Sequence, residues 1–333
     1  MAWARGARLG PTVAGFATPS IASTGPSIGA MLHCLSGSAP MSPVSPRLSS
    51  LGVAGVCRLR MAACLVVAML TGCAHWQADA PASERSAERL SAVLPADVLL
   101  LGEQHDAAEH QALQRESVQA LAARGQLAAL ALEMAESGRS TAGLSRWASE
   151  EKVKAALGWS DQAWPWAAHG PVVMQAVRAG VPVLGANLPR ERMKDAMVDV
   201  SLDVQLNPKA LSAQRKAVRD GHCDLLPESQ IGPMTRVQIA RDREMAHTVA
   251  QAVVPGRTVV LVTGSGHANK SLGVPQHLPT DLRVRSVGLV AGERPSSDFD
   301  AVWNTPALPA KDYCASLKTP KKPAAAPAPA RKP

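Results

Sequence analysis

The residues best suited to chemistry follow an apolar segment at residues 98–101. Glu103 and His105 come directly after it, and they point to the same side if the backbone stays extended. Asp106 and Glu109 are spaced like a capping box, which predicts that a helix begins there with Asp106 as its N-cap. A carboxylate and an imidazole would then lie between a strand and a helix, where open parallel sheets bind ligands.

Three more apolar segments lead into polar residues of the same kind. Residues 127–132 are followed by Glu133, and residues 181–187 end on Asn187. Residues 258–263 continue through a Gly-Ser-Gly bend into His267. Because the carboxyl ends of parallel strands share one edge of a sheet, we expect these side chains to lie near Glu103 and His105.

Several kinds of chemistry fit the set Glu103, His105, Glu133 and His267. Two imidazoles and two carboxylates could bind a divalent ion such as zinc or manganese. Without a metal, either glutamate could act as a base with a histidine as its partner. The structural alternative is that Glu103 only caps the next helix and that His267 only makes hydrogen bonds within its own turn. A Gly-X-Gly bend at residues 264–266 could cradle an anion, but this signal is weak.

The elements that position these residues alternate between strand and helix. Apolar segments at residues 98–101, 127–132, 181–187, 258–263 and 284–290 are the expected strands, and helical patterns cover residues 83–94, 107–124 and 140–180. Gly170 and Pro171 should interrupt the last of these. The pattern predicts an α/β fold, a parallel β-sheet flanked by helices on both faces. Residues 191–254 are helical and charged, with a break at 221–228, and predict a small inserted helical subdomain.

A targeting segment precedes this body. Arg58 and Arg60 stand before an apolar run at residues 61–70, which is too short to cross a bilayer and is typical of a secretory signal. The run ends in Leu-Thr-Gly-Cys, which resembles a bacterial lipobox with Cys73 as the lipidated residue. Ala74 stands where aspartate would retain a lipoprotein in the inner membrane, so we expect a periplasm-facing outer-membrane protein. An ordinary cleaved signal or a chance apolar run is the alternative.

Composition divides the chain into four parts. We expect a leader and signal at residues 1–72, with Met41 as the true start, and a tether with a short helix at 73–94. The α/β domain should cover 95–305, and a disordered Lys/Pro/Ala-rich tail 306–333. The net charge of +8 resides in the two ends, because residues 73–314 hold 25 basic and 27 acidic residues. The near-neutral body gives no reason to expect nucleic-acid binding.

Several motifs between residues 95 and 290 resemble the ChaN-like haem-binding lipoprotein family. These are Gly-Glu-Gln-His-Asp at 102–106, Ala-Leu-Glu-Met at 131–134, Gly-Ala-Asn-Leu-Pro-Arg at 185–190, Gln-Ile-Ala-Arg-Asp-Arg-Glu-Met-Ala at 238–246, Gly-Ser-Gly-His at 264–267 and Gly-Val-Pro at 273–275. The resemblance implies haem bound between two protomers and a role in iron acquisition. The wider superfamily includes erythromycin esterase and the Tiki and TraB proteins, some of which are metal-dependent hydrolases.

The resemblance also implies a tyrosine that holds haem, yet the one tyrosine of this chain is Tyr313. His169 stands where relatives have tyrosine before Gly-Pro, and histidine is a competent haem ligand. A plain core or surface histidine is the alternative. Met174 and nearby tryptophans could wall a haem plane or simply pack a helix. Four further residues could brace the site, bind haem propionates or form a structural network: Asn187, Arg190, Arg241 and Asp242.

The remaining predictions concern cysteine and histidine. Cys223 and Cys314 lie in loop-like segments of an exported chain and could form a disulfide, although two unrelated thiols are the alternative. His110 and His247 fall within helices and should be surface residues. The sequence thus favours a haem-binding lipoprotein. The alternatives are a metal-dependent hydrolase that uses Glu103, His105, Glu133 and His267, and a scaffold whose ancestral site has decayed.

Overall fold

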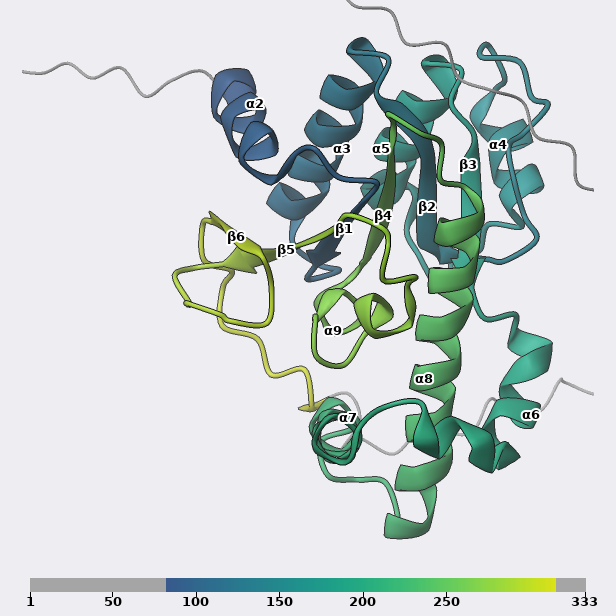
Figure 1. The fold of residues 1–333 in the computed structure, drawn as a ribbon, viewed down its shortest axis with the longest axis vertical. Helices are drawn as coiled ribbons and strands as arrows, with labels where there is room; N and C mark the ends of the chain where they lie inside the picture. The colour runs from purple at the N-terminus through teal and green to yellow at the C-terminus, as the bar shows by residue number, and fades with distance from the viewer. Residues whose placement is uncertain (1–81, 316–333) are drawn as a thin grey trace, which may run out of the picture. The chain divides into compact units, whose positions relative to one another are not determined.

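A parallel sheet forms the centre of the fold. The structure is a computed structural model, and it describes residues 82–315. Within that range six strands form one sheet in the order β3-β2-β4-β1-β5-β6, and all neighbouring strands are parallel (Figure 1). The strands are β1 (Val98–Glu103), β2 (Leu127–Glu136), β3 (Val183–Asn187), β4 (Thr258–Gly264), β5 (Val284–Ala291) and β6 (Ala301–Thr305).

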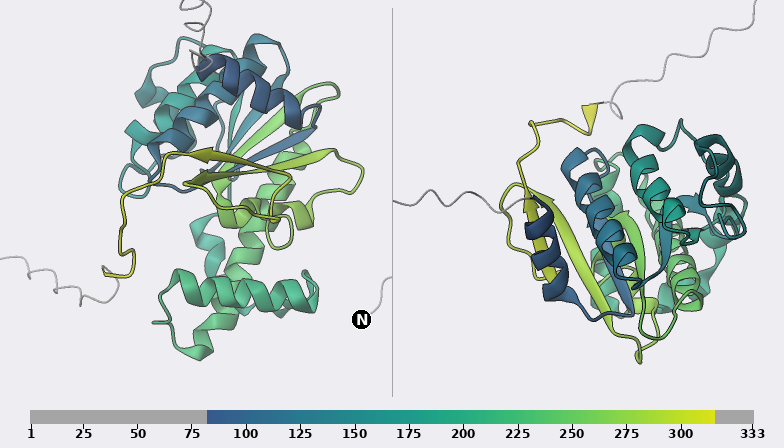
Figure 2. Two further views of the ribbon diagram at one scale, coloured as in Figure 1. Left: turned by 90° about the vertical axis from the view of Figure 1, so that its left-hand side faces the viewer. Right: turned by 90° about the horizontal axis from the view of Figure 1, so that it is seen from above.

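Helices connect the strands and lie on both faces of the sheet (Figure 2). The α-helices are α2 (Ala82–Val93), α3 (Ala108–Ala123), α4 (Glu150–Leu157), α5 (Trp166–Arg178), α6 (Met193–Val198), α7 (Pro208–Gly221), α8 (Glu228–Gln251) and α9 (Ser265–Ala268). Three short 3₁₀ segments are η1 (Arg190–Arg192), η2 (Val200–Val204) and η3 (Val274–His277). This architecture confirms the predicted α/β fold. Among the described residues no helix is both long and apolar enough to cross a membrane.

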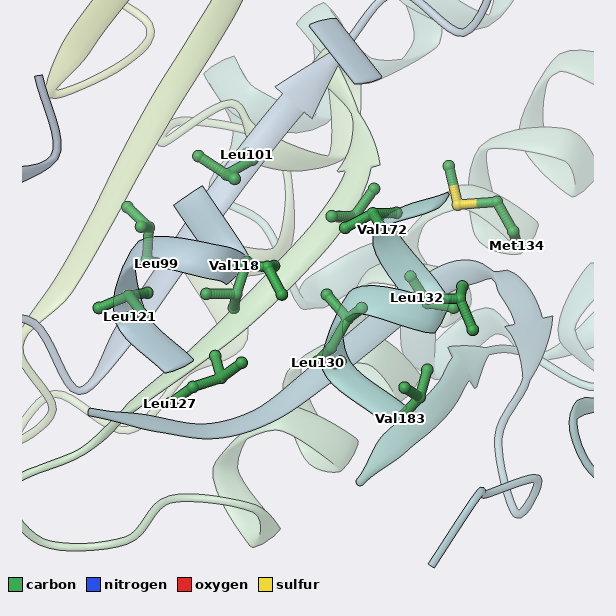
Figure 3. Packing of buried hydrophobic residues seen from close by; sticks show 14 of the residues in the cluster. Leu99, Leu101, Val118, Leu121, Leu127, Leu130, Leu132, Met134, Val172 and Val183 are labelled. Atoms are coloured by element: carbon green, nitrogen blue, oxygen red, sulfur yellow. The ribbon is translucent and has the colours of Figure 1, made fainter. Parts of the chain in front are cut away.

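The central strands are buried on both faces, so their apolar residues divide into two cores. Alternate residues of a strand point to opposite faces. In β1, Leu99 and Leu101 pack with residues of α3 and α5, including Val118 and Val172 (Figure 3). Val98 and Leu100 belong to the core on the other face, where α8 and α9 cover the sheet. This two-sided burial explains the continuous apolar runs in the sequence.

The helical subdomain lies beyond one end of the sheet, beside the first part of α8 (Figure 1). It contains α6, η2 and α7, and it has an apolar core of its own. The residues of that core are Leu188, Ala196, Leu202, Leu206, Ala210, Val237 and Ile239. The later part of α8 packs on the sheet through Met245 and Val249. One long helix therefore joins the predicted insertion to the sheet.

Several local predictions were wrong because tertiary contacts decide them. The N-cap of α3 is Ala107, which makes no side-chain cap, while Asp106 instead accepts hydrogen bonds from Lys311 and Tyr313. His110 is buried rather than on the surface, since its ring accepts from the Gln104 amide and contacts Thr305. Gly170 and Pro171 lie inside α5 and do not interrupt it. His247 is exposed, as predicted.

The end of the described chain is held to the subdomain. Cys223 and Cys314 form a disulfide with their Cα atoms 5.8 Å apart, which confirms the predicted pair. Residues 306–315 thus run from β6 to the turn between α7 and α8. The predicted signal, the lipidation site at Cys73 and residues 316–333 lie outside the described part of the chain.

Candidate functional site

The four residues predicted to do chemistry meet at the carboxyl edge of the sheet. Glu103 ends β1, and its neighbour across the ladder is Gly264, the last residue of β4. Glu133 lies in β2, on the other side of β4, and His267 lies in α9 directly after β4. Segments far apart in the sequence therefore deliver these side chains to one place. They form two groups, one around Glu103 and one around Glu133.

The first group is centred on the buried carboxylate of Glu103. This carboxylate accepts a hydrogen bond from Gln114 of α3 at 2.7 Å and bonds Nδ1 of His105 at 2.8 Å. Because Nδ1 is engaged, Nε2 of His105 is the nitrogen left for a ligand. Trp164 packs edge-on against the imidazole, with 4.8 Å between ring centroids. The ring is thus fixed on two sides, while its side chain is 40% exposed.

The charge of His105 is set by its neighbours. Burial lowers the pKa of this imidazole, but the hydrogen bond to Glu103 and the charge of Glu133 outweigh burial, so the pKa is raised. The site therefore stabilises the protonated ring relative to a free imidazole. A ligand that takes the Nε2 lone pair competes with that proton.

The second group is centred on Glu133. Its carboxylate accepts hydrogen bonds from the Thr263 hydroxyl at 2.8 Å and the Gly264 amide at 2.7 Å. Nε2 of His267 lies 3.6 Å from it, and Nδ1 of His267 bonds Asp242 at 2.6 Å. Burial lowers the pKa of His267, but the charges of Glu133 and Asp242 outweigh burial and raise it to about 9. Burial raises the pKa of Asp242 to about 6 against the charge of His267, so the two form an ion pair near neutral pH.

These contacts do not assemble the divalent-metal site that the sequence suggested. In residues 82–315 no group of three or more His, Cys, Asp or Glu side chains is placed to hold a metal ion. The reason is geometric. Glu103 and Glu133 each accept hydrogen bonds within their own group, and the two histidines bond different carboxylates through Nδ1.

A cavity of about 570 Å³ opens beside both groups. His105 and Glu133 line it, together with Trp164. The rest of the lining is mixed: its apolar residues are Met134, Ala135, Leu157, Ala163, Leu188 and Met193, and its polar residues include Glu136, Arg139, Ser160, Asn187, Arg190 and Arg241. This volume falls within the range of small-molecule and cofactor sites. The cavity therefore joins the imidazole of His105 to a surface that suits a ligand with both apolar and charged parts.

Three arginines also line the cavity, namely Arg139, Arg190 and Arg241. Asn187, another predicted site residue, is part of the same wall and donates from Nδ2 to the Glu133 carbonyl at 2.9 Å. The Oδ1 atom of Asn187 and the Nε atom of Arg241 are buried and have no hydrogen-bond partner. The structure thus brings together Asn187, Arg190 and Arg241 as the sequence suggested.

His169 does not reach the cavity. Its side chain is 1% exposed, and it lies against Trp159 and Trp164 with Nδ1 3.9 Å from the Glu103 carboxylate. Burial lowers its pKa, which favours the neutral ring. Met174 packs on the core of the α3 and α5 face and does not wall the cavity. The residue predicted to bind haem is thus placed behind Glu103, and His105 is the imidazole that faces the cavity.

Some site residues were missed from the sequence. Gln114 holds Glu103 from the inward side of α3, and its position follows only from how that helix packs on the sheet. Trp164 was noted as one of several tryptophans, without its contact to His105. Arg139 could have been found, because it follows β2 directly at the edge where ligands were expected.

Fold and site together define an α/β protein with a ligand cavity at the carboxyl edge of a parallel sheet. The chain belongs to the family described as haem-binding uptake, Tiki superfamily, ChaN, which matches residues 90–278. The expected family is thus confirmed. No curated protein sequence matches the chain.

A solved ChaN structure shares the fold, and other solved structures are less similar. A ChaN protein of Campylobacter jejuni, described as binding haem cofacially, is 24% identical with a TM-score of 0.55, and the match covers 66% of this chain and 90% of that one. The type III effector HopBA1 is 17% identical with a TM-score of 0.35, over 67% of this chain and 94% of that one. A Bacillus cereus protein is 13% identical with a TM-score of 0.35, over 64% and 70%.

Proposed function

We propose that this protein binds haem in the cavity beside His105 and serves in haem or iron acquisition. Membership of a haem-binding uptake family supports the ligand. The observation that carries the proposal is the way His105 is held: its Nδ1 is hydrogen-bonded to Glu103, and its ring lines the cavity. Histidines that ligate metals usually bond a carboxylate or carbonyl through the other ring nitrogen in this way.

The cavity residues fit a haem group. Imidazole nitrogen is a common axial ligand of haem iron, and the apolar residues of the mixed lining suit the porphyrin ring. When bound, haem supplies an iron centre that accepts the lone pair of one ring nitrogen. The chain contributes the orientation of that ring, through Glu103 and Trp164.

A haem titration followed by absorption tests this proposal. Addition of haem to the purified protein should give a saturable shift of the Soret band, and His105→Ala should weaken binding by at least about tenfold, because the metal–ligand bond is lost. His247→Ala is the matched control, since His247 is exposed on α8 and does not line this cavity. Unfolding temperatures of both variants would establish that the fold is intact. No Soret shift in the unaltered protein would rule out haem binding.

We further propose that lipidation of Cys73 anchors the protein to the periplasmic side of the outer membrane. The lipobox-like sequence and the residue after it support this address. A lipid-anchored haem protein could receive its ligand close to the site of uptake. Binding of haem between two copies of the chain stays a prediction, and sedimentation with and without haem would test it.

A further inference from the structure

We propose that the cavity selects its ligand by ionised carboxylate arms, which Arg139, Arg190 and Arg241 (the arginine cluster) bind independently of any iron. This inference rests on the proposed haem function and names what that site recognises. It predicts that porphyrins without metal bind as long as their carboxylates are free. Charge, rather than iron alone, would then decide which tetrapyrroles enter.

The arginine cluster is assembled from three different elements. Arg139 follows β2, and its guanidinium packs over Gly158 at the end of α4, where a Cβ atom on the glycine would lie 3.3 Å from Nε. Arg190 begins η1 after β3, and its amide donates to the Glu136 carboxylate at 3.0 Å. Arg241 lies on α8 and is half-buried. The fold therefore brings three cations to one cavity wall.

No carboxylate forms an ion pair with any of the three guanidinium groups among the residues that the structure describes. Arg192, only two residues from Arg190, pairs instead with Glu244 at 2.9 Å. The Nη2 atom of Arg241 has merely the Met193 sulfur at 3.7 Å. A half-buried guanidinium without a partner is unfavourable, and a carboxylate ligand would satisfy it through short charge-assisted hydrogen bonds.

The acidic residues of the same cavity do not cancel this charge. Glu133 is satisfied by Thr263 and Gly264 and lies beside protonated His267. Glu136 accepts the Arg190 amide, so its carboxylate faces the backbone of η1. An anion that enters therefore meets guanidinium donors that are still free.

The position of the cluster in the sheet indicates a large ligand. Nε2 of His105 lies beside Gly264, the last residue of β4, and β2 and β3 are one and two strands away from β4, which is roughly 5 and 10 Å at the usual strand spacing. His105 follows β1, whereas Arg139 and Arg190 follow β2 and β3. A ligand that meets both must carry its acidic groups well away from its centre. Porphyrins with carboxylate side chains on one edge have this form.

Binding of protoporphyrin IX and of its dimethyl ester tests the inference without iron. Both probes are added to the full-length protein in the same mild detergent, and binding is followed by porphyrin fluorescence. The free acid should bind at least about tenfold more tightly than the ester, because hydrogen bonds to charged groups are the strong ones. Arg190→Gln and Arg241→Gln should each remove most of that difference, while Arg192→Gln should leave it unchanged.

The outcomes separate this inference from the proposed function. If haem gives its His105-dependent Soret shift but the acid and the ester bind equally, carboxylate selection is wrong and haem binding stands. The inference would also be overturned if the wild type, Arg190→Gln and Arg241→Gln all preferred the free acid over the ester to the same extent. If neither haem nor protoporphyrin binds, the proposed function itself fails.

Discussion

Glu103 determines which ring nitrogen of His105 is available to bind a ligand. The carboxylate takes Nδ1 at 2.8 Å and is itself held by Gln114, so the imidazole cannot rotate without loss of a buried hydrogen bond. Trp164 packs edge-on against the same ring. The side chain is thus ordered before any ligand arrives, which lowers the entropy that binding would otherwise cost.

Substitution of Gly264 should disturb His105 without unfolding the protein. A Cβ atom on Gly264 would lie 2.9 Å from Nε2 of His105, and the backbone angles of −63° and 151° suit alanine. In Gly264→Ala the ring must move, and haem affinity should fall by about tenfold, the effect of a misplaced ligand. Gly266→Ala is the control, because an added Cβ meets nothing within 4 Å there. If Gly264→Ala bound haem as tightly as the wild type, this placement of His105 would be contradicted.

His267 should make the protein more stable below neutral pH than above it. Its pKa is raised to about 9 from a usual 6.5, so its protonated form stabilises the fold fully below pH 6.5. That contribution is lost as pH rises through 9. The free energy of unfolding should therefore fall between pH 6.5 and 9.5, on the order of 2 kcal/mol, and fall less in His267→Gln. The free energy of unfolding is measured by urea unfolding. If it falls equally in the wild type and in His267→Gln, the ion pair is not the source of the pH dependence.

The sequence was sufficient for the pair Glu103 and His105, because two residues in extended backbone point to the same side. The sequence was not sufficient to predict where the side chains of His169 and His110 lie. Both lie on helices, and which side of a helix is buried depends on neighbours distant in sequence. His169 is covered by tryptophans of its own region, whereas His110 contacts Thr305 of the last strand.

The connection of strands creates the site. β4 enters the sheet between β1 and β2, so the chain returns after the helical subdomain and places Gly264 and His267 between Glu103 and Glu133. The apolar runs predict the strands, since burial on both faces requires them. The runs do not predict this order. β6 was missed because its five residues include Asn304 and Thr305 and form no apolar run.

The disulfide should stabilise the connection between the subdomain and the last described residues. Cys223 and Cys314 are 91 residues apart, so the bond closes a long loop in the unfolded chain. Replacement of both by serine should lower the free energy of unfolding by about 2–4 kcal/mol. Reduced wild type should match the double variant in urea unfolding, and reductant should not alter the variant. Equal stability of oxidised wild type and the variant would show that the bond contributes nothing.

The segment before the disulfide also touches the loop that carries the site. Lys311 and Tyr313 contact Asp106, the residue that follows His105. These are exposed contacts, and the lysine ion pair is worth little by itself. The disulfide is therefore the main restraint on residues 306–315.

The complete protein should be attached to a membrane by one cysteine. Metabolic labelling with an alkyne palmitate should modify the wild type, and Cys73→Ser should abolish both the label and recovery in the outer-membrane fraction, since an acyl anchor is the proposed attachment. Cys64→Ser is the control, because Cys64 lies in the same apolar run but not at the lipobox position. A label that persists in Cys73→Ser would exclude this site.

Chemical rescue of His105→Gly tests most directly whether Nε2 of His105 binds the haem iron. The variant removes the imidazole but does not alter the apolar residues of the cavity lining or the arginine cluster. We expect the Soret spectrum of the haem complex to differ from wild type and to return to it when millimolar imidazole is added, because free imidazole can fill the vacated position. A His105→Gly complex with the wild-type spectrum in the absence of imidazole would contradict the proposed site.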